Sequence, residues 1–245
     1  MQLEEKKQVE VLLMDYFRSI YPVFPKGKLI PSESPDFIID MKPRNSVGIE
    51  ITRLYPSDQK SILPPPEDSS FEMKFINKVK ELVEGYSAQP LFVKFLFKKG
   101  HSINETQILS AAIMSAVSIR KTLNNTKSDF SFKIISQSQL PSFLKSVLVL
   151  RHRLLVTPVW DKANHQGLSN NIAADISNAI LKKNDKLKLY QSKNLQQYWL
   201  LITTDQLEAI RNVNIGNQIT HKKFSSLFHR VFLFELMKGR VIHLV

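Results

Sequence analysis

The sequence is organised around the stretch Glu33-Ser-Pro-Asp-Phe-Ile-Ile-Asp-Met-Lys-Pro-Arg-Asn-Ser-Val-Gly-Ile-Glu-Ile-Thr52. It holds an apolar run from Phe37 to Met41, a polar break from Lys42 to Asn45, and a second apolar run from Val47 to Leu54. Two short runs rich in β-branched residues on either side of a Pro/Asn break predict a β-hairpin.

Two carboxylates belong to this hairpin. Asp36 stands where the first strand is expected to begin, and Glu50 lies inside the second strand. A hairpin can bring such positions side by side, and two carboxylates held on rigid strands suit a divalent cation such as Mg²⁺, or Mn²⁺ in its place. The alternative is a surface hairpin whose acids are ordinary solvated side chains.

Pro35-Asp36 followed further along by Glu50-Ile51-Thr52 resembles the motif of the PD-(D/E)xK nuclease superfamily, which has the restriction-endonuclease-like fold. The resemblance implies that Asp36 and Glu50 are metal ligands, helped by the backbone carbonyl of Ile51. It also implies phosphodiester hydrolysis as the reaction. The sequence departs from the family at Thr52, because the family usually has a lysine two residues after the glutamate.

Some members of that superfamily take the lysine from a neighbouring helix, and a helix predicted from Ser169 to Leu187 offers two candidates. Its apolar face is formed by Ile172, Ile176, Ile180 and Leu187. Lys183 falls in the middle of this stripe and Lys186 at its edge, although a lysine within an apolar stripe is uncommon unless its ammonium group meets an acid. The alternative is a lysine that favours the helix C-terminus and points to solvent.

Two further acids are candidates for the same site. Residues 2 to about 20 predict a helix with a one-sided apolar face, and Glu5 falls at the edge of that face. Glu33 precedes Asp36 by three residues and could be a third carboxylate. Each has a plainer interpretation, Glu5 as a first-turn residue that favours the helix dipole and Glu33 as a polar loop residue.

The composition is that of a folded, basic protein without cysteine. Lys and Arg number 34 against 22 acids, which gives a net charge of +12. Such a surplus favours polyanionic partners, because side chains that neutralise phosphates release counterions. The charge alone does not select between DNA and RNA, and we expect DNA more than RNA. With no signal peptide pattern and no apolar run long enough for a membrane span, we expect a cytoplasmic protein and no membrane partner.

These observations predict one α/β domain over residues 1–245, with a restriction-endonuclease-like core. A mixed central β-sheet would begin with the hairpin, carry helices on both faces and add two C-terminal strands, Arg230 to Leu236 and Arg240 to Leu244. The predicted function is Mg²⁺-dependent cleavage of nucleic acid, with Lys183 or Lys186 near the metal. The alternative is a catalytically silent nucleic-acid-binding or interaction module on the same fold.

Overall fold

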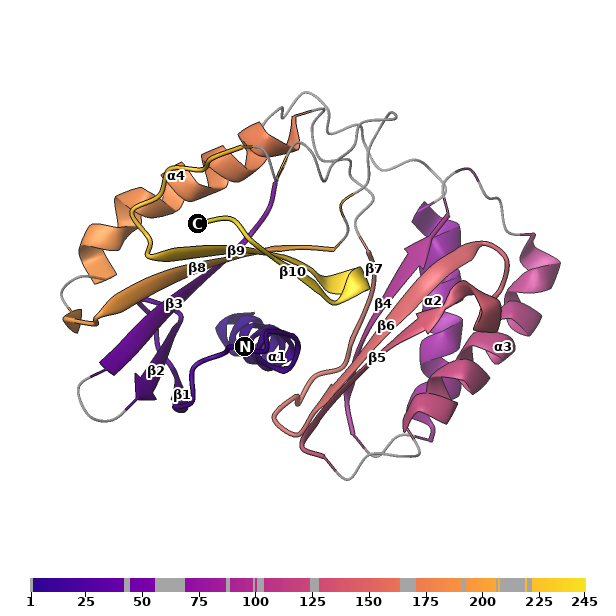
Figure 1. The fold of residues 1–245 in the computed structure, drawn as a ribbon. Coiled ribbons are helices and arrows are strands. Elements are labelled where there is room, and N and C mark those ends of the chain that lie inside the picture. Colours follow the sequence, from indigo (N-terminus) through magenta and orange to yellow (C-terminus); the bar gives the residue numbers. More distant parts are fainter. Residues whose placement is uncertain are drawn as a thin grey trace. The chain divides into compact units, whose positions relative to one another are not determined.

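The computed structural model describes residues 2–41, 45–55, 69–86, 89–98, 100, 104–123, 128–163, 171–190, 193–205, 207, 219 and 222–245. The chain forms two compact units (Figure 1). The first unit comprises Met1–Tyr16 and Leu63–Asn164, and the second comprises Phe17–Ile62 and His165–Val245. The sequence predicted a single domain with one central sheet, whereas each unit has a sheet of its own.

The second unit contains a mixed sheet of six strands in the order β1-β2-β3-β8-β9-β10. The strands are β1 (Lys28–Pro31), β2 (Phe37–Met41), β3 (Asn45–Arg53), β8 (Gln197–Thr204), β9 (Arg230–Glu235) and β10 (Arg240–His243). The central strands β3, β8 and β9 run parallel, whereas β1, β2 and β10 pair antiparallel with their neighbours. The predicted mixed α/β architecture is confirmed.

The predicted hairpin is present as β2 and β3. Phe37 pairs with Ile49 and Met41 pairs with Asn45, so the two strands run antiparallel. Residues 42–44, which hold most of the predicted break, lie outside the described residues. The C-terminal strand pair is also present as β9 and β10, and the 3-10 turn Leu236–Lys238 with Gly239 joins them.

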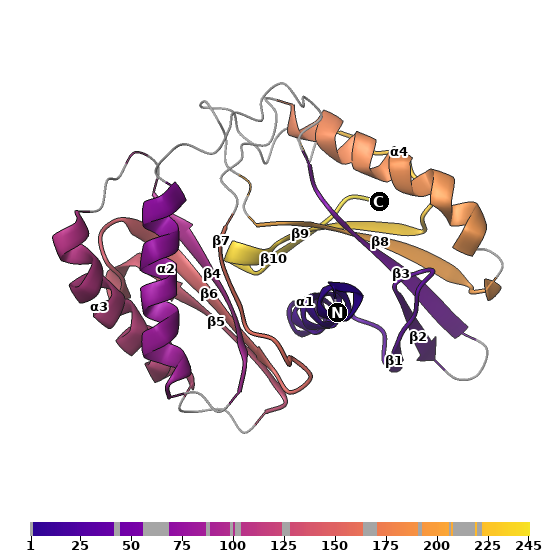
Figure 2. The same cartoon turned by 180° about the vertical axis from the view of Figure 1, so that it is seen from behind.

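Helical residues of the second unit pack on both faces of the six-stranded sheet, from α4 on one face and from Phe17 onward at the end of α1 on the other (Figures 1 and 2). On one face, α4 (Ile172–Tyr190) contributes the buried stripe predicted for it, which packs with Leu200 and Val231. On the other face, the end of α1 (Gln2–Ile20) places Phe17 5.4 Å from the ring of Phe232. Alternate residues of the central strands face these two layers, as strand geometry requires.

The start of α4 differs in one detail from the prediction. The Asn171 side chain accepts a hydrogen bond from the amide of Ala174 at 3.0 Å, so Asn171 caps the helix. Ser169, the predicted cap, lies outside the described residues.

The first unit contains a second sheet of four strands in the order β5-β6-β4-β7. The strands are β4 (Leu91–Phe97), β5 (Phe130–Ser136), β6 (Leu144–His152) and β7 (Val159–Lys162). Helices α2 (Ser69–Glu84) and α3 (Glu105–Leu123) cover one face, and Phe75 packs edge-on against Phe95 beneath them. All of β4 is buried, as predicted for a central strand. None of the helices in the described parts of the chain is both long and apolar enough to cross a membrane.

Candidate functional site

Glu50 lies in the layer between the sheet and α4. In the parallel register of β3 and β8, Glu50 pairs with Leu200, a fully buried residue of the core beneath α4. Glu50 is itself only 5% exposed. Burying a carboxylate at an apolar position of this kind costs free energy unless charged or hydrogen-bonding groups contact it.

The ammonium group of Lys183 contacts the carboxylate of Glu50. Its Nζ lies 2.5 Å from Oε1 of Glu50, within the apolar stripe of α4. The side chains of Lys183 and Glu50 are 16% and 6% exposed, respectively. This contact explains why the stripe contains a lysine, and it places Lys183 beside one of the two carboxylates, as the sequence predicted.

Tyr190 is a third member of this group, which the sequence reasoning missed. It follows Lys183 by seven residues, which is close to two helical turns and places both on one face of α4. Its buried hydroxyl donates a hydrogen bond to Glu50. Burial raises the pKa of Tyr190 well above its usual value, and the charge of Glu50, this hydrogen bond and the charge of Asp36 raise it further. The hydroxyl is therefore a fixed hydrogen-bond donor to the carboxylate.

Asp36 lies directly before β2 and is half-buried. Its Oδ2 accepts a hydrogen bond from the backbone amide of Ile51 at 2.7 Å. Because the N–H and C=O of one residue in an extended strand point to the same edge, the carbonyl of Ile51 faces the same side as Asp36. The three groups predicted to bind a metal thus belong to adjoining positions of the hairpin.

Gly48 makes room for this arrangement. A Cβ atom at Gly48 would lie 2.7 Å from Cγ of Pro35 and 2.8 Å from Cδ1 of Leu195. Pro35 is the residue before Asp36, so the missing side chain lets the start of β2 lie close over β3. A glycine inside a predicted strand often marks such a close approach, and this signal was available in the sequence.

Thr52 occupies the position at which the family resemblance places a lysine. It pairs with Ile202 and lies two residues after Glu50, so both side chains belong to the same face of β3. The hydroxyl of Thr203 donates to the backbone carbonyl of Thr52 at 3.3 Å. The cationic group near Glu50 therefore comes from α4 and not from β3.

The other candidate residues do not join the group around Glu50. Lys186 is exposed on α4, and Glu33 is exposed in the segment before β2. Glu5 is exposed and belongs to the first unit, whereas Asp36 belongs to the second. Among the described residues, no group of three or more His, Cys, Asp or Glu side chains is arranged to hold a metal ion. The site consequently offers two carboxylates.

The donor atoms nevertheless fit a hard divalent cation. Asp36, Glu50 and the carbonyl of Ile51 present only oxygen, and Mg²⁺ commonly uses one or two carboxylates together with water and substrate phosphate. Of these groups, Glu50 is the candidate ligand that contacts Lys183 and Tyr190. A bound cation would share this carboxylate with Lys183.

Comparison of the chain with protein-family models, curated proteins and solved structures finds no match. Any functional inference for this protein therefore depends on its own residues. The group formed by Asp36, Glu50, Lys183 and Tyr190 combines charge, burial and direct contact at the positions of the hairpin motif.

Proposed function

We propose that this protein is a metal-dependent nuclease that hydrolyses nucleic-acid phosphodiester bonds, in the manner of the PD-(D/E)xK superfamily. The observation that carries the proposal is the 2.5 Å contact between Nζ of Lys183 and Oε1 of Glu50. It supplies from α4 the lysine that the hairpin motif lacks. Asp36, joined to β3 through the amide of Ile51, supplies the second carboxylate.

Each residue of the group has a distinct role in this proposal. Asp36, Glu50 and the carbonyl of Ile51 would hold Mg²⁺ or Mn²⁺, which when bound polarises the scissile phosphate and lowers the pKa of a coordinated water. The ammonium group of Lys183 orients the attacking water or stabilises the negative charge that develops on the phosphate oxygens. Tyr190 holds Glu50 in one orientation through its hydroxyl.

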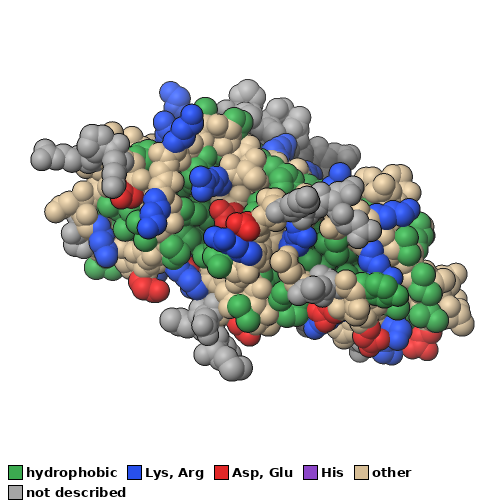
Figure 3. Space-filling model, turned by 90° about the horizontal axis from the view of Figure 1, so that it is seen from below, with side chains coloured by type: hydrophobic (Ala, Val, Ile, Leu, Met, Phe, Trp, Pro, Cys, Tyr) green, Lys and Arg blue, Asp and Glu red, His purple; other side chains and the backbone are tan. Residues whose placement is uncertain are grey.

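The net charge of +12 supports a nucleic-acid substrate, although it does not select between the DNA that we expect and RNA. Lys and Arg side chains are spread over the face shown in Figure 3, among hydrophobic and neutral residues, and acidic side chains occupy a few separate places. A distributed positive surface of this kind suits contacts with many phosphates of a backbone more than recognition of one base sequence.

The second candidate is a nucleic-acid-binding module without catalysis. The observation in its favour is that Lys183 already compensates the charge of Glu50, so the pair is complete without a cation. In this case the buried pair would only fix the position of α4 on the sheet, and Asp36 would serve only to hold the hairpin.

A cleavage assay separates the two candidates. Wild-type protein is incubated with plasmid DNA, single-stranded DNA and RNA in Mg²⁺, in Mn²⁺ and in EDTA. We expect cation-dependent cleavage that is lost in Asp36→Asn and Glu50→Gln. It should be retained in Asp40→Asn, because Asp40 is an exposed acid on β2, the strand that Asp36 directly precedes. Binding of these substrates without cleavage in either cation would reject the nuclease and favour the binding module.

A further inference from the structure

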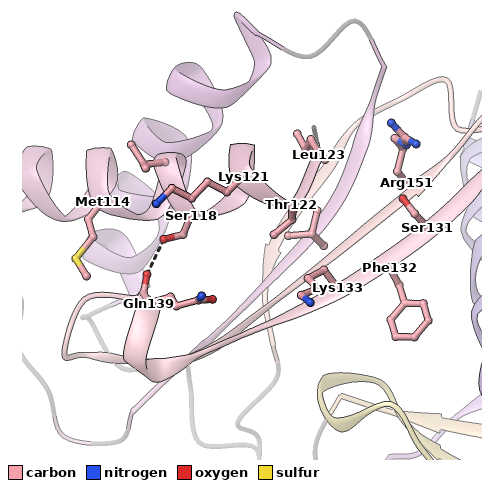
Figure 4. A pocket seen from close by; sticks show the side chains of 12 residues that line it. Met114, Ser118, Lys121, Thr122, Leu123, Ser131, Phe132, Lys133, Gln139 and Arg151 are labelled. Atoms are coloured by element: carbon pink, nitrogen blue, oxygen red, sulfur yellow. Dashed lines mark hydrogen bonds between the residues drawn. The ribbon is translucent and has the colours of Figure 1, made fainter. Parts of the chain in front are cut away.

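A second candidate site lies in the first unit, between α3 and the strands β5 and β6. It is a pocket of about 690 Å³ (Figure 4). Helix α3 forms one side of the pocket, and side chains of β5 and β6 form the other. Its volume is within the range of about 300–1,000 Å³ that is usual for small-molecule sites.

Three cationic side chains line this pocket, one from each element. They are Lys121 of α3, Lys133 of β5 and Arg151 of β6. Lys133 pairs with Val149 and Ser131 pairs with Arg151, so the two strands direct Lys133 and Arg151 to the same face of the sheet. No acidic side chain is among the described residues that line the pocket. Cations gathered around one hollow attract anions, and the guanidinium group of arginine matches the oxygens of a phosphate.

The same pocket has an apolar part. Met114 and Val117 of α3 line it, although they are 44% and 43% exposed, and Val149 lines it from β6. Gln139 and Ser118 lie at this end, where the Ser118 hydroxyl donates to the backbone carbonyl of Gln139 at 2.6 Å (Figure 4). Arg151 and Ser131 lie at the opposite end. The pocket thus combines cationic side chains spread along its length, which can meet a phosphate, with apolar side chains and an amide that can meet a flat, hydrogen-bonding group.

We infer that this pocket binds a nucleoside phosphate, either as a free nucleotide or as the phosphorylated end of a nucleic-acid strand. The phosphate lies among Lys121, Lys133 and Arg151, and the base packs against Met114 and Val117. The side-chain amide of Gln139 can donate to and accept from a base edge. The inference does not depend on the proposed hydrolysis, because none of these residues belongs to the group around Glu50.

The test is isothermal titration calorimetry of the full chain in EDTA, which prevents metal-dependent cleavage. The ligands are adenosine monophosphate, inorganic phosphate, and one short single-stranded DNA with either a 5′-phosphate or a 5′-hydroxyl. The variant is Lys121→Gln/Lys133→Gln. The matched control is Lys28→Gln/Lys223→Gln, which removes the same charge from exposed positions in the second unit.

We expect the pocket variant to weaken nucleotide binding by about tenfold or more and the control to leave it unchanged. If the mononucleotide and the phosphorylated strand bind with comparable affinity, the natural ligand is a free nucleotide. If the phosphorylated strand binds much more tightly than the mononucleotide, and this binding is lost when the 5′-phosphate is removed, the natural ligand is a strand end. Equal binding by wild type and pocket variant, binding no tighter than that of inorganic phosphate, or no binding overturns the inference. Circular dichroism checks that both variants are folded.

Discussion

The contact between Lys183 and Glu50 places two charged groups in a layer that consists mainly of aliphatic and aromatic side chains. A buried ion pair of this kind contributes little net stability, but removal of one partner leaves an uncompensated charge in the interior. Lys183 is therefore expected to matter both for the stability of the second unit and for the proposed reaction.

Replacing Lys183 tests both roles. We expect Lys183→Met to abolish cleavage and to lower the free energy of unfolding by about 3–5 kcal/mol, because Glu50 loses its counter-charge. The double variant Glu50→Gln/Lys183→Met should recover most of this stability without recovering activity. Urea unfolding followed by tryptophan fluorescence in a Trp160→Phe background, which leaves Trp199 of the same unit as the reporter, measures the stability.

Lys186→Met is the control for that experiment. Lys186 is exposed on the same helix, so its replacement should change the free energy of unfolding by less than about 0.5 kcal/mol. If both single variants lose the same stability, the charge of Lys183 is not specifically required by Glu50. If Lys183→Met retains full cleavage activity, the lysine has no part in the reaction.

The hydrogen bond from Tyr190 to Glu50 predicts a dependence of stability on alkaline pH. The pKa of Tyr190 in the folded protein is above its ordinary value of 10.0. The unfolded chain therefore loses this proton first, and the contribution of Tyr190 to stability is complete below pH 10 and declines as the pH rises further. Unfolding free energies measured from pH 8 to about 11 should fall less steeply in Tyr190→Phe than in wild type.

Part of the loss of stability at alkaline pH should persist in Tyr190→Phe, because burial also raises the pKa of Tyr16 in the first unit. A Tyr16→Phe variant provides the comparison in which the Tyr190 contribution remains. If Tyr190→Phe and wild type lose stability in parallel above pH 10, the hydroxyl of Tyr190 is not held as a donor.

At the scale of single elements, the hairpin depends on a glycine. We expect Gly48→Ala to destabilise the second unit by about 1–3 kcal/mol, because the added methyl group overlaps Pro35 and Leu195 in a packed layer. The displacement of Pro35 would move Asp36 away from the amide of Ile51, so any cleavage activity should fall more than the stability loss explains. Thermal unfolding and the cleavage assay measure the two effects.

Gly85→Ala is the matched control for this substitution. A Cβ atom at Gly85 would have its nearest neighbour, the carbonyl oxygen of Glu81, at 3.8 Å, which is ordinary contact. This substitution should be neutral or slightly stabilising, because it restricts the unfolded chain. Equal effects of the two substitutions would show that the close approach at Gly48 does not constrain the hairpin.

The elements that the sequence predicted well are those defined by local patterns. The hairpin, the strand pair β9 and β10, and the stripe of α4 follow from alternation, from turn residues and from 3.6-residue spacing. The place of Lys183 in that stripe made it a candidate partner for an acid, although the pattern left open a lysine that points to solvent, and the structure shows the contact with Glu50. Tyr190 was not predicted, because an aromatic residue at the end of an apolar face is usually a core residue.

At the scale of the whole molecule, local patterns could not define how the strands are distributed between sheets. The strands β4 to β7 pair only among themselves, while β3 pairs with β8 from much later in the chain. Such pairing depends on contacts between distant segments, and an apolar strand such as β4 has the same pattern in either sheet. The prediction of one central sheet over residues 1–245 arose from this ambiguity.

The net charge of +12 leads to a prediction for the entire chain. If the protein binds nucleic acid through its distributed basic surface, the logarithm of the association constant should fall linearly with the logarithm of the salt concentration. With several phosphate contacts, the affinity should decrease by orders of magnitude between about 50 and 200 mM salt. Fluorescence anisotropy with a labelled single strand and a labelled duplex, in EDTA, measures this slope.

The variants of the pocket in the first unit refine this experiment. If Lys121 and Lys133 contact phosphates of a bound strand, their joint replacement by glutamine should reduce the salt slope by about two, since each phosphate contact contributes about one. The Lys28→Gln/Lys223→Gln control removes the same net charge, so an equal change in both variants would indicate a general charge effect. If binding does not change with salt, or if no binding occurs even at low salt, a nucleic-acid partner is contradicted. A small anionic molecule would then be the ligand to test for both sites.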